Sequence, residues 1–342
     1  MTVLDTAART RPLLLRAGAR FTCFADGVCC TDMHRLGPLS SADVASLHAL
    51  GRSASLIERV PGEIELGCAP SGACALLDEA RCSLHMAEGP LAKPSICRRF
   101  PYSIVATPLG GRVATAHRCP CRTLGDRAPL DAVAVEEALA GLPGAVRAVP
   151  GRVRLAERTS LSLAQWASLE APLIDRLAGG EPAHAVLRVD PSLPSIDGPS
   201  WSRTAEVFRA YGAGAQRGFA AMAWFGDGIA ALLGEPVSPR ERPWAEGFDR
   251  AERRAEATRS PAEILGDFIA DLIWDLSWVD QGSFERARVT LGALAAIASA
   301  VAARLAALGL RPDRAMAEAV LVTELSAAHR LWAETARRID RG

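Results

Sequence analysis

The nine cysteines are the residues of this chain whose type and spacing could most readily do chemistry, and all of them lie between Cys23 and Cys121. Thiolates are nucleophiles and soft metal ligands, so a dense group of them inside a cell, where disulfides are rare, indicates metal binding or catalysis. Three thiols and a carboxylate fall within eight residues, in the run Cys23-Phe-Ala-Asp26-Gly-Val-Cys29-Cys30. This density favours chelation of a metal ion.

The spacing of the cysteines restricts the kind of metal centre. The sequence contains no C-x2-C pair and no H-x3-5-H, so the common zinc-finger and ferredoxin patterns are missing. Sulfur donors nevertheless select zinc or an iron–sulfur cluster over calcium or magnesium. In an extended segment, Cys29 and Cys30 would point to opposite faces, which suits separate sites or opposite sides of a polynuclear centre. We expect an iron–sulfur centre, with zinc as the alternative; the later candidate ligands are Cys68, Cys74, Cys82, Cys97, Cys119 and Cys121.

The non-cysteine residues around these thiols carry a family resemblance. The segments Cys82-Ser-Leu-His85 and Lys93-Pro-Ser-Ile-Cys97-Arg-Arg-Phe-Pro101, together with Cys74, resemble the CxxCxxCC, or YkgJ-type, family of zinc- or iron-chelating proteins. The resemblance covers about residues 20–121. It implies a thiolate metal site that includes Cys23, Cys29, Cys30, Cys74, Cys82, Cys97 and Cys119.

The chain departs from this family at one ligand position. The second cysteine of the CxxCxxCC run falls on Asp26. Either Asp26 supplies an oxygen ligand, or Cys68 or Cys121 substitutes, or one site has lost a ligand. His85 replaces the usual tyrosine and is expected beside the metal site rather than on the metal.

A looser resemblance links the chain to flagellin lysine N-methylases. The shared features are Cys119-Pro120 and a helical block over residues 268–329. The resemblance implies S-adenosylmethionine-dependent methyl transfer to lysine side chains of a protein substrate, with an iron–sulfur cluster present. The glycine-rich segment 212–218 follows an expected helix rather than a strand, so we interpret it as a helix break and not as a nucleotide loop. No catalytic residue can be assigned, and whether the protein is an enzyme stays open.

Composition excludes several other classes. The chain is 49% hydrophobic and 23% charged, which predicts a folded protein of about two domains. Its 39 basic and 39 acidic residues cancel and aromatic residues make up only 5%, so we expect no nucleic-acid binding. The longest uncharged stretch, residues 289–303, is shorter than the roughly 20 residues that span a bilayer, so we expect no membrane association and a cytoplasmic location.

The fold expected from these features is α+β. We predict an N-terminal segment over residues 1–19, then a small, loop-rich cysteine-cluster domain with a short β-hairpin over residues 20–128. A mainly helical domain follows over residues 129–342. In the cysteine domain, Ser40 and Asp43 indicate a capping box for a helix that ends near residue 51. The hairpin is expected as strands 102–107 and 112–117, joined by a turn at 108–111, and delivers Cys119.

Local signals also place the main helices of the second domain. Ser260, Pro261 and Glu263 predict a helix running to about Val279, with Trp274 and Trp278 on one buried stripe. Further helices are expected from Ser283 to about Gly309 and from Asp313. The second of these carries His329 on its apolar face. Residues 152–158 are expected to form a strand that could pair with the first domain.

These patterns leave three functional classes open. The first is a metal-dependent modifying enzyme with its active site between the domains. The second is a binding module in which the metal only stabilises the fold and the helical domain recognises a partner protein. The third is an iron or redox sensor. All three share a metal centre held by cysteines.

Overall fold

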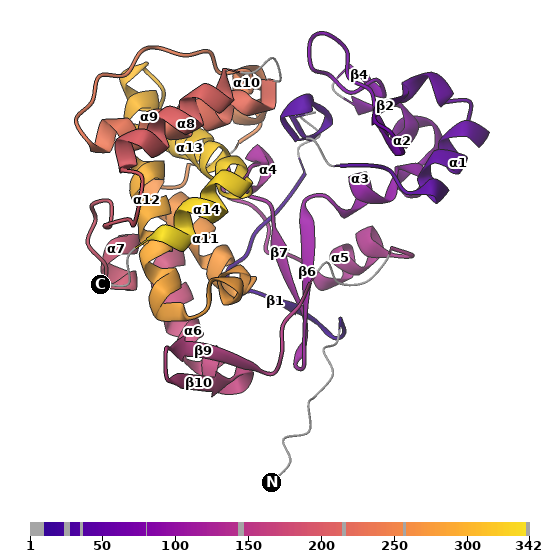
Figure 1. Cartoon of the computed structure of the whole chain (residues 1–342). Coiled ribbons are helices and arrows are strands. Elements are labelled where there is room, and N and C mark those ends of the chain that lie inside the picture. The colour runs from indigo at the N-terminus through magenta and orange to yellow at the C-terminus, as the bar shows by residue number, and fades with distance from the viewer. Residues whose placement is uncertain are drawn as a thin grey trace.

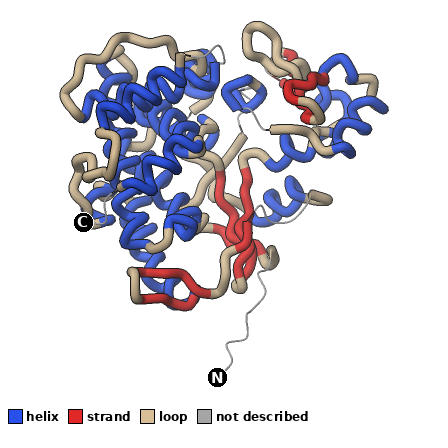
Figure 2. The backbone as a smooth tube through the Cα atoms, viewed as in Figure 1, coloured by secondary structure: helices blue, strands red, loops and turns tan. Residues whose placement is uncertain are grey.

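The computed structural model describes most of the chain and confirms the α+β class. Helices are packed on one side of a small central sheet, and a lobe rich in loops lies on the other side (Figures 1 and 2). The described residues are 10–23, 28–34, 37–79, 81–142, 147–213, 217–255 and 258–339. Asp26, one of the candidate ligands, lies outside them.

The central sheet has four strands in the order β1-β7-β6-β8. The hairpin strands β6 and β7 pair antiparallel, whereas β1 and β8 add in parallel at the two edges. Helix α11 packs against β7. The sheet therefore takes strands from each of the three predicted sequence ranges: β1 (Leu13–Leu15), β6 (Tyr102–Thr107), β7 (Gly110–Thr115) and β8 (Arg147–Ala148).

The predicted hairpin is present, but its turn is shorter than expected. Gly110 and Gly111, expected in the turn, belong to β7. A Cβ on Gly110 would lie 2.4 Å from the carbonyl oxygen of Pro12, and one on Gly111 would lie 2.4 Å from that of Thr10. The glycines are therefore strand residues that let the chain entering β1 approach β7 closely.

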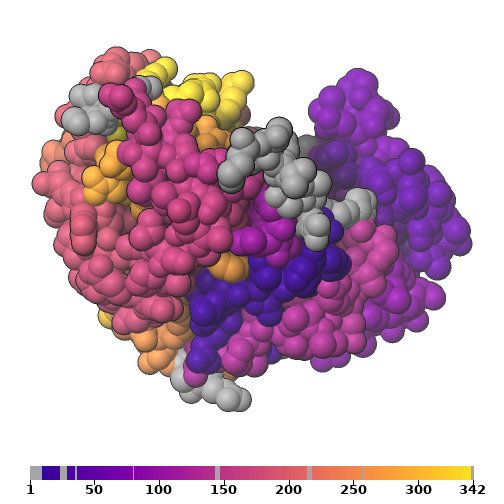
Figure 3. All heavy atoms as spheres, turned by 90° about the horizontal axis from the view of Figure 1, so that it is seen from below, coloured from indigo at the N-terminus to yellow at the C-terminus, as the bar shows by residue number. Residues whose placement is uncertain are grey.

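The cysteine lobe, defined as the described residues between 28 and 100, forms a protrusion at one side of the molecule (Figures 1 and 3). Its predicted helix is confirmed as α1, with Ser40 as N-cap and Asp43 closing the capping box. Its core contains three buried residues, Leu47, Leu76 and Leu84. The elements of the lobe are η1 (Val28–Cys30), η2 (Asp32–His34), α1 (Ser41–Ala49), η3 (Ser53–Ser55), β2 (Leu56–Val60), β3 (Glu63–Leu66), β4 (Leu77–Asp78), β5 (Arg81–Cys82), α2 (Ser83–Glu88), η4 (Pro90–Ala92) and α3 (Ser95–Arg99).

The helical body has a much larger core, which includes Trp166, Phe225 and Ile269 and also receives Met33 from the cysteine lobe. Helices α9, α11, α12 and α13 pack on one another at its centre. Its elements are α4 (Pro120–Thr123), β9 (Arg152–Ala156), β10 (Thr159–Ser162), α6 (Leu163–Ala178), α7 (Ala183–Leu187), α8 (Trp201–Gly212), η5 (Arg217–Phe219), α9 (Ala220–Leu232), α10 (Ala245–Glu252), α11 (Pro261–Trp274), η6 (Ser277–Gln281), α12 (Phe284–Ala307), α13 (Pro312–Ala327) and α14 (Arg330–Arg338). Helix α5 (Ala132–Leu139) packs instead on β1 and α3, and its Val135 and Leu139 form a separate small core with Ile104 and Val113 of the sheet.

Two predicted helices begin as expected, but the predicted end of the first was wrong. Ser260 caps α11 and Ser283 caps α12. Helix α11 ends at Trp274 rather than Val279, because Leu276 adopts a left-handed conformation with a φ of 58°. Trp274 and Trp278 are therefore not on one helical stripe.

The prediction for His329 and the partner expected for strand 152–158 were also wrong. Helix α13 ends at Ala327, and His329 caps the next helix, where its Nδ1 accepts a hydrogen bond from the Leu331 amide. The ring of His329 packs on Tyr211. Strand β9 pairs with β10, because the tight reversal after Ala156 returns the chain directly onto it.

Helix α12 is long and apolar enough, by length and hydropathy alone, to cross a membrane. However, 61% of its most apolar window is buried inside the protein. It packs against α9, α11 and α13, as the central helix of a soluble core does.

Candidate metal centre

Five thiols from four separate segments of the cysteine lobe come within electrostatic range of one another. They are Cys29 and Cys30 of η1, Cys74, Cys82 at the end of β5, and Cys97 of α3. A hydrogen bond with Cys29, burial and the neighbouring thiols together raise the pKa of Cys30 far above its ordinary value. Burial raises the pKa of Cys97 to about 12, with Cys74, Cys82 and Cys29 adding to the effect against Lys93. Without a cation among them, these thiols oppose one another's ionisation.

A short hairpin over residues 67–75 is the scaffold of this thiol cluster. The amide of Ala69 donates to the carbonyl of Ala73, and the amide of Ala75 donates to that of Gly67, each at 2.8 Å. Cys68 and Cys74 form a bridge pair between these hydrogen bonds. The loop Pro70-Ser71-Gly72 closes the hairpin, with Gly72 at a φ of 83° as three-residue hairpin loops require.

The same hairpin holds the segment that carries the first two thiols of the cluster. The amide of Cys74 donates to the carbonyl of Cys30 at 2.8 Å, and the amide of Asp32 donates to the carbonyl of Gly72 at 2.8 Å. Thr31 and Ala73 form the bridge pair between these bonds. Cys30 is therefore fixed by backbone hydrogen bonds beside Cys74, although the two are far apart in the sequence.

The other two thiols are positioned by helix starts. Cys82 pairs with Leu77 across β4 and β5 and is the N-cap residue of α2. Cys97 lies in α3, whose Ser95 donates to the Asp43 carboxylate from its amide, at 2.8 Å, and from its hydroxyl, at 2.6 Å. Burial favours the neutral form of Asp43, but the hydrogen bonds from Ser95 and Ser40 outweigh this effect and lower its pKa. The cap of α1 thus also anchors the helix that carries Cys97.

Apart from the thiols, the centre of the lobe contains few apolar side chains that stabilise it. Three buried leucines form its core, and Cys74 and Cys82 pack against them half-buried. Small domains whose apolar core is this limited commonly depend on a metal or disulfides for stability. Cys30, Cys68, Cys74, Cys82 and Cys97 are not joined in disulfides in this structure.

The donor set fits a zinc ion or an iron–sulfur cluster, because both take thiolate sulfur. Within the described ranges, no three His, Cys, Asp or Glu side chains are already arranged to hold a metal ion. Closure around an ion would therefore require the thiol side chains to rotate. Five thiols exceed the four protein ligands that a single tetrahedral zinc or a four-cysteine cluster takes.

Of the remaining predicted cysteine ligands, Cys68 lies beside the cluster, next to Cys74, and the others lie elsewhere. Cys23 is exposed and lies near Tyr102. The pKa of Tyr102 is raised to about 12, mainly by burial and further by the charges of Cys23 and Asp131. Cys119 caps α4 and Cys121 lies within it, both buried where α4 packs on α10 and α13. Cys68 is exposed opposite Cys74; burial and the carboxylates of Asp32 and Glu65 raise its pKa, against Arg59.

The histidines near the cluster have structural contacts. His34 is buried, its Nε2 lies 3.0 Å from the carbonyl oxygen of Arg118, and its ring packs edge-on against Phe100. The amide of Arg118 in turn donates to the Glu324 carboxylate of α13. His34 therefore belongs to the junction between the cysteine lobe and the helical body. His85 is exposed on α2.

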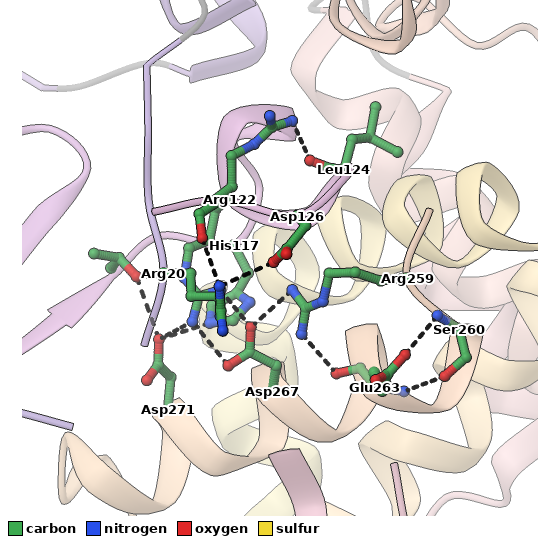
Figure 4. Close-up of polar contacts among 12 residues, drawn as sticks. Arg20, His117, Arg122, Leu124, Asp126, Arg259, Ser260, Glu263, Asp267 and Asp271 are labelled. Atoms are coloured by element: carbon green, nitrogen blue, oxygen red, sulfur yellow. Dashed lines mark hydrogen bonds and ion pairs between the residues drawn. The ribbon is translucent and has the colours of Figure 1, made fainter. Parts of the chain in front are cut away.

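A second polar cluster, not anticipated from the sequence, joins the sheet to α11 (Figure 4). Asp267 accepts hydrogen bonds from Arg16, Arg122 and Arg259, and Asp271 accepts them from Arg16, Arg122 and His117. Both carboxylates are almost fully buried. Burial alone would raise their pKa values, but the guanidinium groups dominate and hold both below the ordinary range. Carboxylates locked as anions in this way are weak bases, so we interpret the cluster as a structural junction.

The signal for this second cluster was present in the sequence. Asp267 and Asp271 are four residues apart in the apolar stretch of α11 after Glu263, which places both on one face. Two carboxylates on a buried helix face require basic partners. Nothing local identifies those partners, since Arg16 is 251 positions away from Asp267.

A groove of about 420 Å³ lies between α7, α11 and α12. Its polar lining residues include Glu181, which is paired with Arg176, and Ser299, whose hydroxyl donates to the carbonyl of Ala295. The other lining is largely apolar and rich in small side chains. This lining provides no evident match for the charged and hydroxyl groups of S-adenosylmethionine.

The glycine-rich segment is a helix break in its described part. Helix α8 ends at Gly212, and a Cβ there would lie 2.4 Å from the backbone nitrogen of Ala223 in α9. Gly212 is therefore explained by the close packing of α8 on α9. Residues 214–216 lie outside the described ranges.

Comparison of the chain with family models, with curated proteins and with solved structures gave no significant match.

Proposed function

We propose that the cysteine lobe binds a thiolate-ligated metal centre, with an iron–sulfur cluster favoured over zinc, in a cytoplasmic protein. Its ligands would come from the five thiols of the cluster, Cys29, Cys30, Cys74, Cys82 and Cys97. The observation that carries the proposal is the convergence of these thiols from four segments onto one small, weakly packed region. Free thiols at this density suit a reducing compartment.

A structural zinc ion and a four-cysteine cluster both take four protein ligands, so the number of thiols does not separate them. We favour iron–sulfur because two of the thiols, Cys29 and Cys30, are adjacent in sequence, which suits the larger surface of a polynuclear centre. Such a centre would supply one-electron exchange in addition to cross-linking the lobe, whereas zinc would supply the cross-link alone.

The lobe's own residues show what metal binding would order. Cys30 lies on the segment whose next turn, η2, contributes Met33 to the main core and His34 to the contact with Arg118. A Cβ on Gly218 of η5 would lie 3.2 Å from the carbonyl oxygen of Asp32, so η2 also touches the helical body there. Metal binding at Cys29 and Cys30 would therefore stabilise the junction as well as the lobe.

Paired alanine variants test the proposal. Cys97→Ala removes a thiol of the cluster, and Cys121→Ala removes a buried thiol that lies in α4, against the helical body. After anaerobic purification, we expect Cys97→Ala to lose bound metal and thermal stability together, because metal-binding free energy is also folding free energy. Cys121→Ala should keep the metal content of the wild type. Full metal content in Cys97→Ala would contradict the ligand assignment.

A further inference from the structure

Cys68 and Cys74 face each other across the hairpin that carries the thiol cluster. The flanking hydrogen bonds, Ala69 to Ala73 and Ala75 to Gly67, make Cys68 and Cys74 a non-hydrogen-bonded pair of antiparallel strands. In such pairs the Cα atoms are about 4.5 Å apart and both side chains lie on one face. Disulfides join Cα atoms about 4.4–6.8 Å apart, so this geometry permits a bridge without backbone movement.

The two thiols also differ in accessibility in the way that a two-step exchange requires. Cys68 is exposed, whereas Cys74 is half-buried against the leucine core of the lobe. A soluble disulfide can therefore reach Cys68 first, and Cys74 is placed to resolve the product. The turn residues Pro70 and Gly72 hold the hairpin in this register.

We propose that Cys68 and Cys74 are a redox-active dithiol that reacts reversibly with small disulfides such as oxidised glutathione. Cys68 loses its proton to solvent and attacks one glutathione sulfur, which releases one glutathione thiolate and forms a mixed disulfide. Cys74, after losing its proton, attacks the Cys68 sulfur, which forms the Cys68–Cys74 bond and releases the second glutathione. Two protein thiols are oxidised and one small-molecule disulfide is reduced to two thiols.

The bridge has a consequence that depends on the proposed metal centre. A sulfur in a disulfide is no longer a thiolate ligand, so oxidation removes Cys74 from the thiol cluster. Cys68 itself is not required as a metal ligand, because Cys29, Cys30, Cys82 and Cys97 complete the cluster. The hairpin would thus couple the oxidation state of the thiol pool to metal retention.

Peptide mapping of the full-length chain tests the bridge directly. Trypsin cuts after Arg59 and Arg81 and at no position between them, so residues 60–81 form one peptide with Cys68 and Cys74 as its two cysteines. The reduced, metal-free protein is treated with oxidised glutathione, the remaining thiols are alkylated, and the digest is analysed by mass spectrometry. We expect this peptide to lose the mass of two hydrogens and to regain it with dithiothreitol.

Two results would overturn the proposal. One is a stable glutathione adduct on Cys68 with Cys74 still open to alkylation. The other is a cross-link between this peptide and residues 21–35, which carry Cys23, Cys29 and Cys30, because Cys68 or Cys74 would then pair with that segment instead.

Zinc uptake, measured with a chromophoric chelator, separates the bridge from the metal centre. We expect oxidation to lower the zinc affinity of wild type, because Cys74 is then no longer a ligand, and to leave the affinity of Cys68→Ser, which cannot form the bridge, unchanged. If the bridge forms but reduced protein takes up no metal, the bridge is supported and the proposed function fails. If metal is bound but no bridge forms, the metal centre is supported and this inference fails.

Discussion

Replacement of Asp271 by asparagine should be among the most damaging single changes in this protein. The Asp271 carboxylate is almost fully buried and accepts hydrogen bonds from Arg16, from His117 at 2.7 Å and from Arg122 at 3.3 Å. An amide of the same shape carries no charge, and its nitrogen donates where the carboxylate accepts. The variant therefore removes one negative charge. It also places an N–H donor where a carboxylate oxygen accepted a hydrogen bond.

The size of the effect follows from the charges that remain. In the variant, Asp267 alone faces the guanidinium groups of Arg16 and Arg122, which are both fully buried, and that of Arg259. Leaving a buried charge uncompensated costs about 3–5 kcal/mol. A domain with a total stability of about 5–15 kcal/mol would lose about a fifth of it or more.

Urea unfolding at pH 7, followed by tryptophan fluorescence, measures this loss. The control is Glu181→Gln, which removes one partner of the exposed Arg176–Glu181 pair and should leave the midpoint unchanged. The difference between wild type and Asp271→Asn should also narrow below pH 4, because the arginines lower the pKa of Asp271 and its contribution is lost as acid protonates it. A loss below about 1 kcal/mol at pH 7 would refute the assignment of this cluster as the junction of sheet and α11.

Three further variants test other parts of the structure. Burial raises the pKa of Asp275 to about 6, so the fold loses stability as pH rises from about 4 towards that value, where the unfolded chain is ionised and the folded chain is not; Asp275→Asn should add about 1–2 kcal/mol at pH 7 and nothing at pH 4, and equal gains at both would contradict this origin. A Cβ on Gly266 would lie 1.9 Å from the carbonyl oxygen of Leu177, so Gly266→Ala should cost about 3 kcal/mol in urea unfolding, and a neutral result would show that α6 does not pack this closely on α11. Asp43→Ala removes the capping box of α1 and the anchor of Ser95, and should cost about 1–2 kcal/mol of lobe stability by hydrogen exchange; unchanged protection around α3 would contradict the anchor.

The parts of the fold that were predictable from the sequence depend on local chemistry. Ser40, Ser260 and Ser283 each cap a helix where the sequence predicts one, because a cap needs a hydroxyl and the backbone amides of the same turn. The hairpin strands were found for the same reason, since the chain reverses within one short segment over residues 102–115. Its turn was predicted too long because Gly110 and Gly111 are strand residues that contact the chain before β1, which lies about 100 positions earlier.

The parts that were missed depend on distant partners or on one backbone angle. The left-handed Leu276 ends α11 early, and no residue type at that position signals it. Arg16 and Asp271 are 255 positions apart, so their pairing appears only in the folded chain. The Cys68 hairpin, by contrast, was within reach, because Pro70 and Gly72 between two cysteines are the residues that a three-residue loop prefers.

The most direct test of the central claim is the metal and acid-labile sulfide content of the full-length protein, purified without oxygen and without added metal. We expect iron and sulfide in near-stoichiometric amounts, with loss of both in Cys97→Ala; zinc in their place would retain the centre and change its identity. Protein that carries no iron and no zinc, and that takes up neither when reduced, would contradict the claim that the five thiols form a metal centre.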